Sequence, residues 1–178
     1  MQDSTKAPLL VEFYLQGAHV SGVSRQVEQR RRLVDVLNGQ EGTFELDSAK
    51  LTIQSSGMPR FFPTLSLQKR SIIAAIPHET QDQVRMRAVL NSGMGRAGTM
   101  QAQIAVLVPP YYIEGTAHMA PGSGKLRPDP AVFTHFFPIT AAQLFLPEGQ
   151  SLELPVLLVN RDCISAMALL SEAQLIRP

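Results

Sequence analysis

The sequence predicts a mainly β protein made of two tandem copies of a small bent-sheet or barrel-like module, each with one short helix. Thirteen Pro and twelve Gly divide the 178 residues into short apolar segments of strand length. Matching residues also recur in the same order in both halves of the chain. Repeated structural positions of this kind indicate an internal duplication, and we expect the two copies to be related by a pseudo-twofold axis.

Five segments are rich in β-branched and aromatic residues, which is typical of strands. They are residues 9–22, 43–54, 63–76, 101–115 and 154–168. Residues 81–90 are ambiguous, because their apolar side chains alternate as in a strand while the preceding HETQDQV resembles a helix start. We favour a strand there.

Two stretches have helical features. RRRLVDVLNG, residues 30–39, places Leu33, Val36 and Leu37 on one face and ends at Asn38-Gly39, a common C-terminal signal. The C-terminal stretch ISAMALLSEAQLIRP is the second candidate. Each copy would therefore contain one short helix.

The internal similarity has two blocks. The first has an offset of 93 residues and the second an offset of 91. The matches are Gly22/Gly115, Leu33/Leu126, Phe44/Phe137, Ala49/Ala142 and Leu51/Leu144, then Leu67/Leu158, Arg70/Arg161, Ile73/Ile164 and Ala75/Ala166. Apolar matches alone could arise by chance, but the coincidence of Gly and Arg positions favours duplication.

The duplication sets the expected domain boundaries. Residues 1–8 are a flexible N-terminus, 9–92 the first β module, 93–98 a Gly-rich turn or linker and 99–178 the second β module. Each copy has four or five strands, which are too few to form a stable sheet with one face exposed to water. We therefore expect the copies to pack against each other.

The repeated positions have predicted structural roles. Gly22 and Gly115 suit a close approach of two strands, where a Cβ would clash. Ala49 and Ala142 suit a crowded core. Arg70 and Arg161 are expected at the exposed tip of a hairpin-like reversal or bulge, paired with a carboxylate or, alternatively, bound to a ligand.

The order of these motifs resembles that of Sm-like proteins, which are small bent β-sheets of the SH3-barrel type. The residues that match are Val20, Gly22, Asp35, Asn38 and Leu51 for the first motif, and Arg70 to Ile73 and Arg161 to Ile164 for the second. The resemblance implies ring assembly and single-stranded RNA binding through Asp35, Asn38 and Arg70. The chain also resembles uncharacterised bacterial domains of unknown function, which implies no activity.

Composition limits the function classes. Sixteen Lys and Arg against fifteen Asp and Glu give a net charge of +1, so RNA binding would need a local basic patch. Arg30, Arg31 and Arg32 form such a cluster, although a solvated helix face is its default interpretation. The lone Cys163 precludes an internal disulfide, and with no signal-like or membrane-spanning segment we expect a cytoplasmic protein.

Catalytic, cofactor and metal motifs are not recognisable in the sequence. APGSGK, residues 120–125, lacks the first Gly of a phosphate loop and the Ser or Thr after Lys125. The four His have no zinc-ligand spacing. Asp162 should raise the pKa of the adjacent Cys163 thiol, which favours an inert, buried Cys.

The leading hypothesis is therefore a non-catalytic assembly or protein-interaction module that self-associates or offers strand edges to a protein partner. In VLVPPYYIEG we expect an edge strand, with the prolines blocking pairing and Tyr111 and Tyr112 contacting the partner. One alternative is an Sm-like RNA-binding protein. Another is an enzyme whose site forms between the halves from Asp47, His78 and Asp162.

Overall fold

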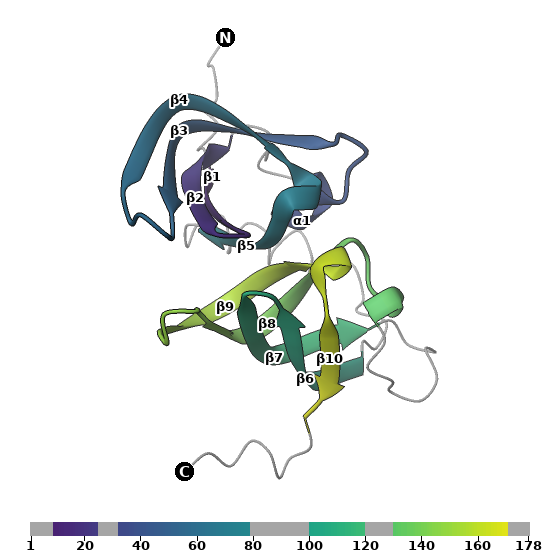
Figure 1. Cartoon of the computed structure of the whole chain (residues 1–178). Helices are drawn as coiled ribbons and strands as arrows, with labels where there is room; N and C mark the ends of the chain where they lie inside the picture. The colour runs from purple at the N-terminus through teal and green to yellow at the C-terminus, as the bar shows by residue number, and fades with distance from the viewer. Residues whose placement is uncertain (1–8, 25–31, 79–99, 120–129, 171–178) are drawn as a thin grey trace. The chain divides into compact units, whose positions relative to one another are not determined.

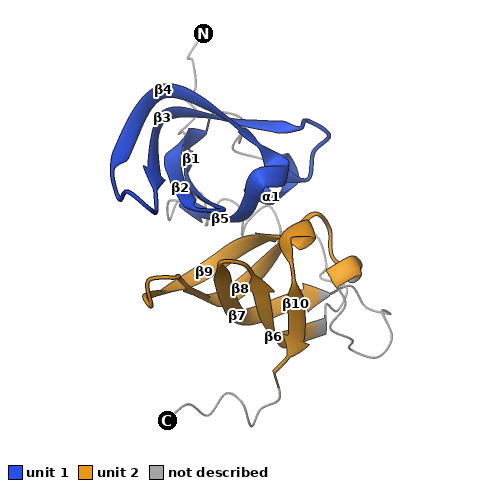
Figure 2. Cartoon of the chain, in the orientation of Figure 1, with its two compact units in different colours: residues 1–95 blue, residues 96–178 orange. Residues whose placement is uncertain are grey.

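A computed structural model of the chain describes residues 9–24, 32–78, 100–119 and 130–170. The chain divides into two compact units, residues 1–95 and 96–178 (Figure 2). Strands dominate both units, so the protein is mainly β, as predicted (Figure 1). The predicted flexible N-terminus, the strand expected at 81–90 and the linker at 93–98 lie outside the described residues.

Unit 1 is a bent antiparallel sheet in the spatial order β5-β1-β2-β3-β4. Its strands curve around a common interior in Figure 2 but do not close into a barrel. Among the described strands of this unit, β4 pairs with β3 only and is an outer strand. The elements are β1 (Leu9–Leu15), β2 (Ala18–Ser24), α1 (Leu33–Leu37), β3 (Thr43–Ile53), β4 (Pro59–Gln68), the 3-10 turn η1 (Lys69–Ser71) and β5 (Ile72–His78).

Unit 2 has the spatial order β10-β6-β7-β8-β9, which is the order of unit 1 when the strands are counted along each unit. Within its described residues, β10 pairs with β6 only and is an outer strand. The elements are β6 (Met100–Val108), β7 (Tyr111–Met119), the 3-10 turn η2 (Pro130–Val132), β8 (Phe136–Phe145), β9 (Ser151–Asn160), the 3-10 turn η3 (Arg161–Cys163) and β10 (Ala166–Leu169).

Each unit has its own apolar core. The largest fully buried side chains in unit 1 are Phe13, Phe44, Leu33, Leu37, Leu46 and Ile72, and those in unit 2 are Tyr111, Phe136, Ile104, Ile113, Ile139 and Leu144. Leu33, Val36 and Leu37 of α1 are all buried, which confirms the helix predicted around them and the face it presents to the core. Burial of these aromatic and aliphatic groups is the main driving force for folding.

A β-bulge bends the same strand pair in each unit. The register between β2 and β3 shifts at Gly22, opposite Ser48, which has a φ of 50°. Between β7 and β8 it shifts at Gly115, opposite Ala141, which has a φ of 46°. A Cβ on Gly22 would lie 3.2 Å from the Asp47 carbonyl oxygen. The predicted role of these glycines in a close strand approach is therefore confirmed.

Several predicted strands are in fact pairs of strands. Residues 9–22 form β1 and β2, because Gly17 adopts a φ of 74° and reverses the chain. Residues 101–115 form β6 and β7, joined at Pro109-Pro110. The prolines therefore do not block pairing: they occupy the turn, and Val108 pairs with Tyr111 on either side of it.

Two further predictions at the second motif are wrong. Arg70 and Arg161 lie in 3-10 turns rather than at hairpin tips, because β4 pairs with β3 whereas β5 pairs with β1. The C-terminal helix does not begin where it was predicted, since Ala166–Leu169 is strand β10, paired with β6. Residues 171–178 lie outside the described part of the chain.

Candidate functional site

The residues suggested by the Sm-like resemblance lie on two connections that are held together in unit 1. Asp35 and Asn38 belong to the α1 connection between β2 and β3, and Arg70 belongs to η1 between β4 and β5. Lys69 joins the two connections: its Nζ donates to the Val36 carbonyl at 2.6 Å and to the Gly39 carbonyl at 3.4 Å. We call this region the α1–η1 corner, defined by residues 32–39 and 69–71.

Lys69 is 7% exposed, and burial lowers the pKa of its ammonium group, with the nearby Glu41 carboxylate acting in the opposite direction. Its charge is directed at the carbonyl oxygens of Val36, in the last turn of α1, and of Gly39, just beyond the helix. Lys69 is therefore a structural residue of the corner.

Asp35 is engaged at the start of α1. Its carboxylate accepts from Arg32 Nε at 3.1 Å, from Arg32 Nη2 at 3.0 Å and from the Arg32 backbone N–H at 3.2 Å. Asn38 is the exposed C-cap, and its backbone N–H donates to Val34. Arg32 and Asp35 thus stabilise the helix that presents them. Arg30 and Arg31 lie outside the described residues.

The two repeated arginines differ in their surroundings. Arg161 Nη1 donates to the Phe133 carbonyl at 3.0 Å, and Nε donates to Asp162 at 3.2 Å. Asp162 also lies 2.9 Å from His135 Nδ1. Arg161 therefore pairs with a carboxylate, as expected. Arg70 is exposed, and among the described residues it has no such ion pair.

Only one of the two tyrosines predicted to contact a partner is accessible to solvent. Tyr111 is 0% exposed, so its side chain belongs to the core and cannot meet a partner. Tyr112 is 36% exposed and stacks near Phe145, with the ring centroids 5.4 Å apart. The expectation of an edge strand here is wrong, because β7 lies between β6 and β8.

The β3–β4 hairpin of unit 1 carries the most exposed apolar side chains. Phe61 is 73% exposed and Met58 71%, and Ile53 at the end of β3 is also exposed. The sequence analysis missed this surface because it began the strand at residue 63 and left Phe61 just before it. Pro59 and Pro63 within β4 were the available signal, since proline inside a sheet is confined largely to edge strands.

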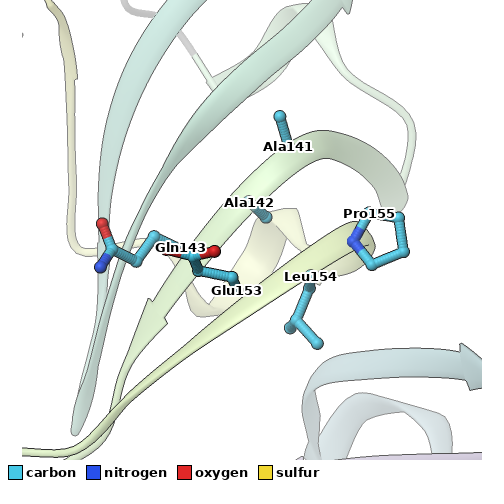
Figure 3. A pocket seen from close by; sticks show the side chains of 6 residues that line it. All are labelled: Ala141, Ala142, Gln143, Glu153, Leu154 and Pro155. Atoms are coloured by element: carbon cyan, nitrogen blue, oxygen red, sulfur yellow. The ribbon is translucent and has the colours of Figure 1, made fainter.

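The β8–β9 hairpin of unit 2 has a hollow of about 380 Å³ beside its bulge (Figure 3). Its lining is mostly small or apolar, with one carboxylate, and consists of Ala141, Ala142, Gln143, Glu153, Leu154 and Pro155. A single carboxylate among these groups provides no general acid and base pair and no nucleophile. The hollow suits binding better than catalysis.

A polar cluster on unit 1 spans three strands and was also missed by the sequence analysis. Glu12 on β1 contacts His19 Nε2 on β2 at 2.9 Å through one carboxylate oxygen, and His78 Nε2 on β5 at 2.8 Å through the other. The hydrogen bond with His19 is the main reason that the pKa of Glu12 is lowered, against an opposing effect of burial. Residues 12, 19 and 78 come together only because β1 lies between β2 and β5.

The enzyme hypothesis invoked Asp47, His78 and Asp162. The contacts described here engage His78 with Glu12 in unit 1 and Asp162 with His135 and Arg161 in unit 2. Within the described ranges, no three His, Cys, Asp or Glu side chains are grouped so that they could hold a metal ion. Cys163 is half-buried, and burial raises the pKa of its thiol, with a smaller contribution from Asp162.

Comparison with known proteins returned no matching family model, no matching curated protein and no matching solved structure. None of the helices in the described part of the chain has the length and apolar character needed to cross a membrane.

Proposed function

We propose that this protein is a non-catalytic assembly module that self-associates through its exposed strand surfaces. The observation that carries the proposal is the β3–β4 hairpin: no described strand pairs with the outer edge of β4, and Phe61 and Met58 are exposed beside it. Open edges flanked by large apolar side chains favour pairing with another chain.

We also propose that the chain is a tandem duplication with pseudo-twofold related copies. This part is supported by the shared strand order, the bulge opposite Gly22 and opposite Gly115, and the 3-10 turns that carry Arg70 and Arg161. An experimental structure tests it by superposition of the two units. Failure of Gly22 and Gly115 to superpose, together with their bulges, would refute the duplication.

The assembly proposal is tested by measuring mass in solution. Sedimentation velocity and light scattering over a wide range of protein concentration should show species that are multiples of the 19.5 kDa chain, with the larger species favoured at higher concentration. A single 19.5 kDa species at every concentration would eliminate self-association as the function.

An Sm-like RNA-binding protein is the second candidate. The observation that favours it is the α1–η1 corner, in which Lys69 holds the segment carrying Asp35 and Asn38 to the turn carrying Arg70. A short single-stranded RNA should then bind with an affinity that falls as salt rises. Arg70→Ala should weaken binding, whereas Lys50→Ala, an exposed cation on β3, is the matched control. No binding at low salt would exclude this candidate.

A further inference from the structure

The distal halves of the two equivalent hairpins carry opposite charge. Each half starts at the residue with positive φ, Ser48 in unit 1 and Ala141 in unit 2. Residues 48–68 contain Lys50 and Arg60 and no Asp or Glu. Residues 141–160 contain Glu148 and Glu153 and no Lys or Arg. The segment from the bulge onward is therefore cationic in unit 1 and anionic in unit 2, whereas the β3 residues before the bulge, Glu45 and Asp47, are acidic.

The cationic hairpin is a protrusion with an apolar end. Arg60 is exposed next to Phe61, whose ring is 73% exposed. Lys50 is the cross-strand partner of Phe61 and lies on the same face of the sheet, so one cation stands beside the ring, whereas Arg60 faces the other side. Neither Arg60 nor Lys50 forms an ion pair with any residue that the structure describes. An exposed aromatic ring beside a cation is the composition of an interface anchor.

The anionic hairpin provides a complementary concave surface. Its hollow of about 380 Å³ falls within the range of roughly 300–1,000 Å³ typical of binding pockets. Figure 3 shows Glu153 beside Leu154 and Pro155 on β9, with Ala141 and Ala142 on the neighbouring strand. The alanines have no side-chain atoms beyond Cβ, which leaves room at the bulge. Glu153 pairs across the strands with uncharged Gln143 and has no ion-pair partner within the described residues.

We propose that the Phe61 ring of one copy inserts into the Glu153 hollow of a second copy, and that Lys50 of the first copy, which lies on the same face as Phe61, pairs with Glu153 of the second. This inference rests on the proposed function and specifies the surfaces through which self-association occurs. Charge complementarity selects the arrangement: two cationic hairpins would repel each other, as would two anionic ones, whereas one of each attract.

The resulting contact is heterologous, because each copy contributes a different surface to it. The first copy then retains an unused hollow and the second an unused hairpin, so assembly continues until a ring closes or a filament grows. A symmetric dimer is not the expected product.

Substitution of the apolar anchor is the first test. Phe61→Ser should reduce the association constant at least tenfold, measured by sedimentation velocity on the full chain. Leu10→Ser is the matched control, because Leu10 is also an exposed apolar residue of a unit 1 strand, and it should leave association unchanged. Equal losses in both variants would overturn the assignment of the anchor.

Charge reversal is the decisive test. Lys50→Glu and Glu153→Arg should each abolish assembly alone, since each places like charges across the contact. Mixing the two variants restores opposite charges at both kinds of contact, so the mixture should assemble. Arg70→Glu is the control, because it reverses a charge of unit 1 outside the hairpin end.

The outcomes separate this inference from the broader function. If the wild-type chain assembles but charge reversal has no effect, or if the mixture fails to assemble, the proposed contact is refuted while self-association stands. If the wild-type chain is monomeric at every concentration, both are refuted. Circular dichroism of each variant confirms that loss of assembly is not loss of folding.

Discussion

The two units share a strand order but present different surfaces. Unit 1 has a cationic hairpin with an exposed Phe61 and the cluster Glu12, His19 and His78, whereas unit 2 has an anionic hairpin with a hollow. The β-bulge, the 3-10 turn and the core residues occupy corresponding positions in the two units. The comparison teaches that close packing constrains the backbone and its small residues strictly, while exposed side chains on the same frame can vary freely.

The bulge glycines should show the largest effect on stability, and a difference between the units. A Cβ on Gly115 would lie 2.5 Å from Ile139 Cγ2 and 3.0 Å from the Thr140 carbonyl oxygen, whereas the nearest atoms to Gly22 are 3.2 Å away. Gly115→Ala should therefore cost about 1–3 kcal/mol, and Gly22→Ala less. Thermal unfolding measures both. Gly42→Ala, with nothing within 4 Å, is the control. Equal destabilisation at all three positions would contradict the bulge argument.

The cationic side chains on the 3-10 turns of the two units should differ in how much they stabilise the fold. Lys69→Met leaves the Val36 and Gly39 carbonyls without their buried donor, which should cost about 1–3 kcal/mol. Arg161→Met removes a part-buried hydrogen bond with the Phe133 carbonyl and should cost about 0.5–1.5 kcal/mol. Denaturant unfolding measures the free energy of unfolding of each variant and so ranks the two losses. Arg70→Met, on the exposed side of η1, should be nearly neutral, and the ordering fails if it matches Lys69→Met.

Glu12 of unit 1 should make the stability of the chain depend on pH. The pKa of Glu12 lies below its usual value of 4.5 in the folded chain, mainly because of the hydrogen bond with His19. Its contribution to stability is therefore complete above the unfolded pKa and is lost as pH falls through the lower folded pKa. Thermal stability should fall between neutral pH and a pH below 4.5, and Glu12→Gln should make this fall smaller. Glu153→Gln is the control, and the prediction fails if both variants change the profile alike.

The smallest effect concerns the single thiol of unit 2. Burial and Asp162 raise the pKa of Cys163, so little of it is thiolate near neutral pH. Alkylation by iodoacetamide should be slower in the native chain than in the chain unfolded by urea. Asp162→Asn should accelerate the native reaction slightly. A native Cys163 that reacts as fast as the unfolded one would show that its surroundings have no effect.

Local patterns predicted part of this architecture well. The spacing of Leu33, Val36 and Leu37 before Asn38-Gly39 identified α1, because a helical face and its end signal are encoded within one short segment. The matched glycines identified the two close strand approaches, which the structure places at bulges. The strand content followed from β-branched and aromatic composition, which indicates strands without their partners.

The failures have a common physical cause. Tyr111 and Tyr112 are adjacent in sequence, yet one is buried and the other exposed, because successive residues of a strand face opposite sides. The segment Ala166–Leu169 has helical composition but lies against β6 and is a strand. Tertiary context overrides local propensity for such short segments.

The sequence by itself determined the mainly β class, the helix α1, the positions that require glycine and the opposite charges of residues 48–68 and 141–160. Those properties depend on neighbouring residues or on composition alone. Only the tertiary structure decided which side chains meet. Glu12 joins His19 and His78, Lys69 caps α1, and Glu153 lines a hollow with Ala141, because strand pairing brings together residues that the chain separates.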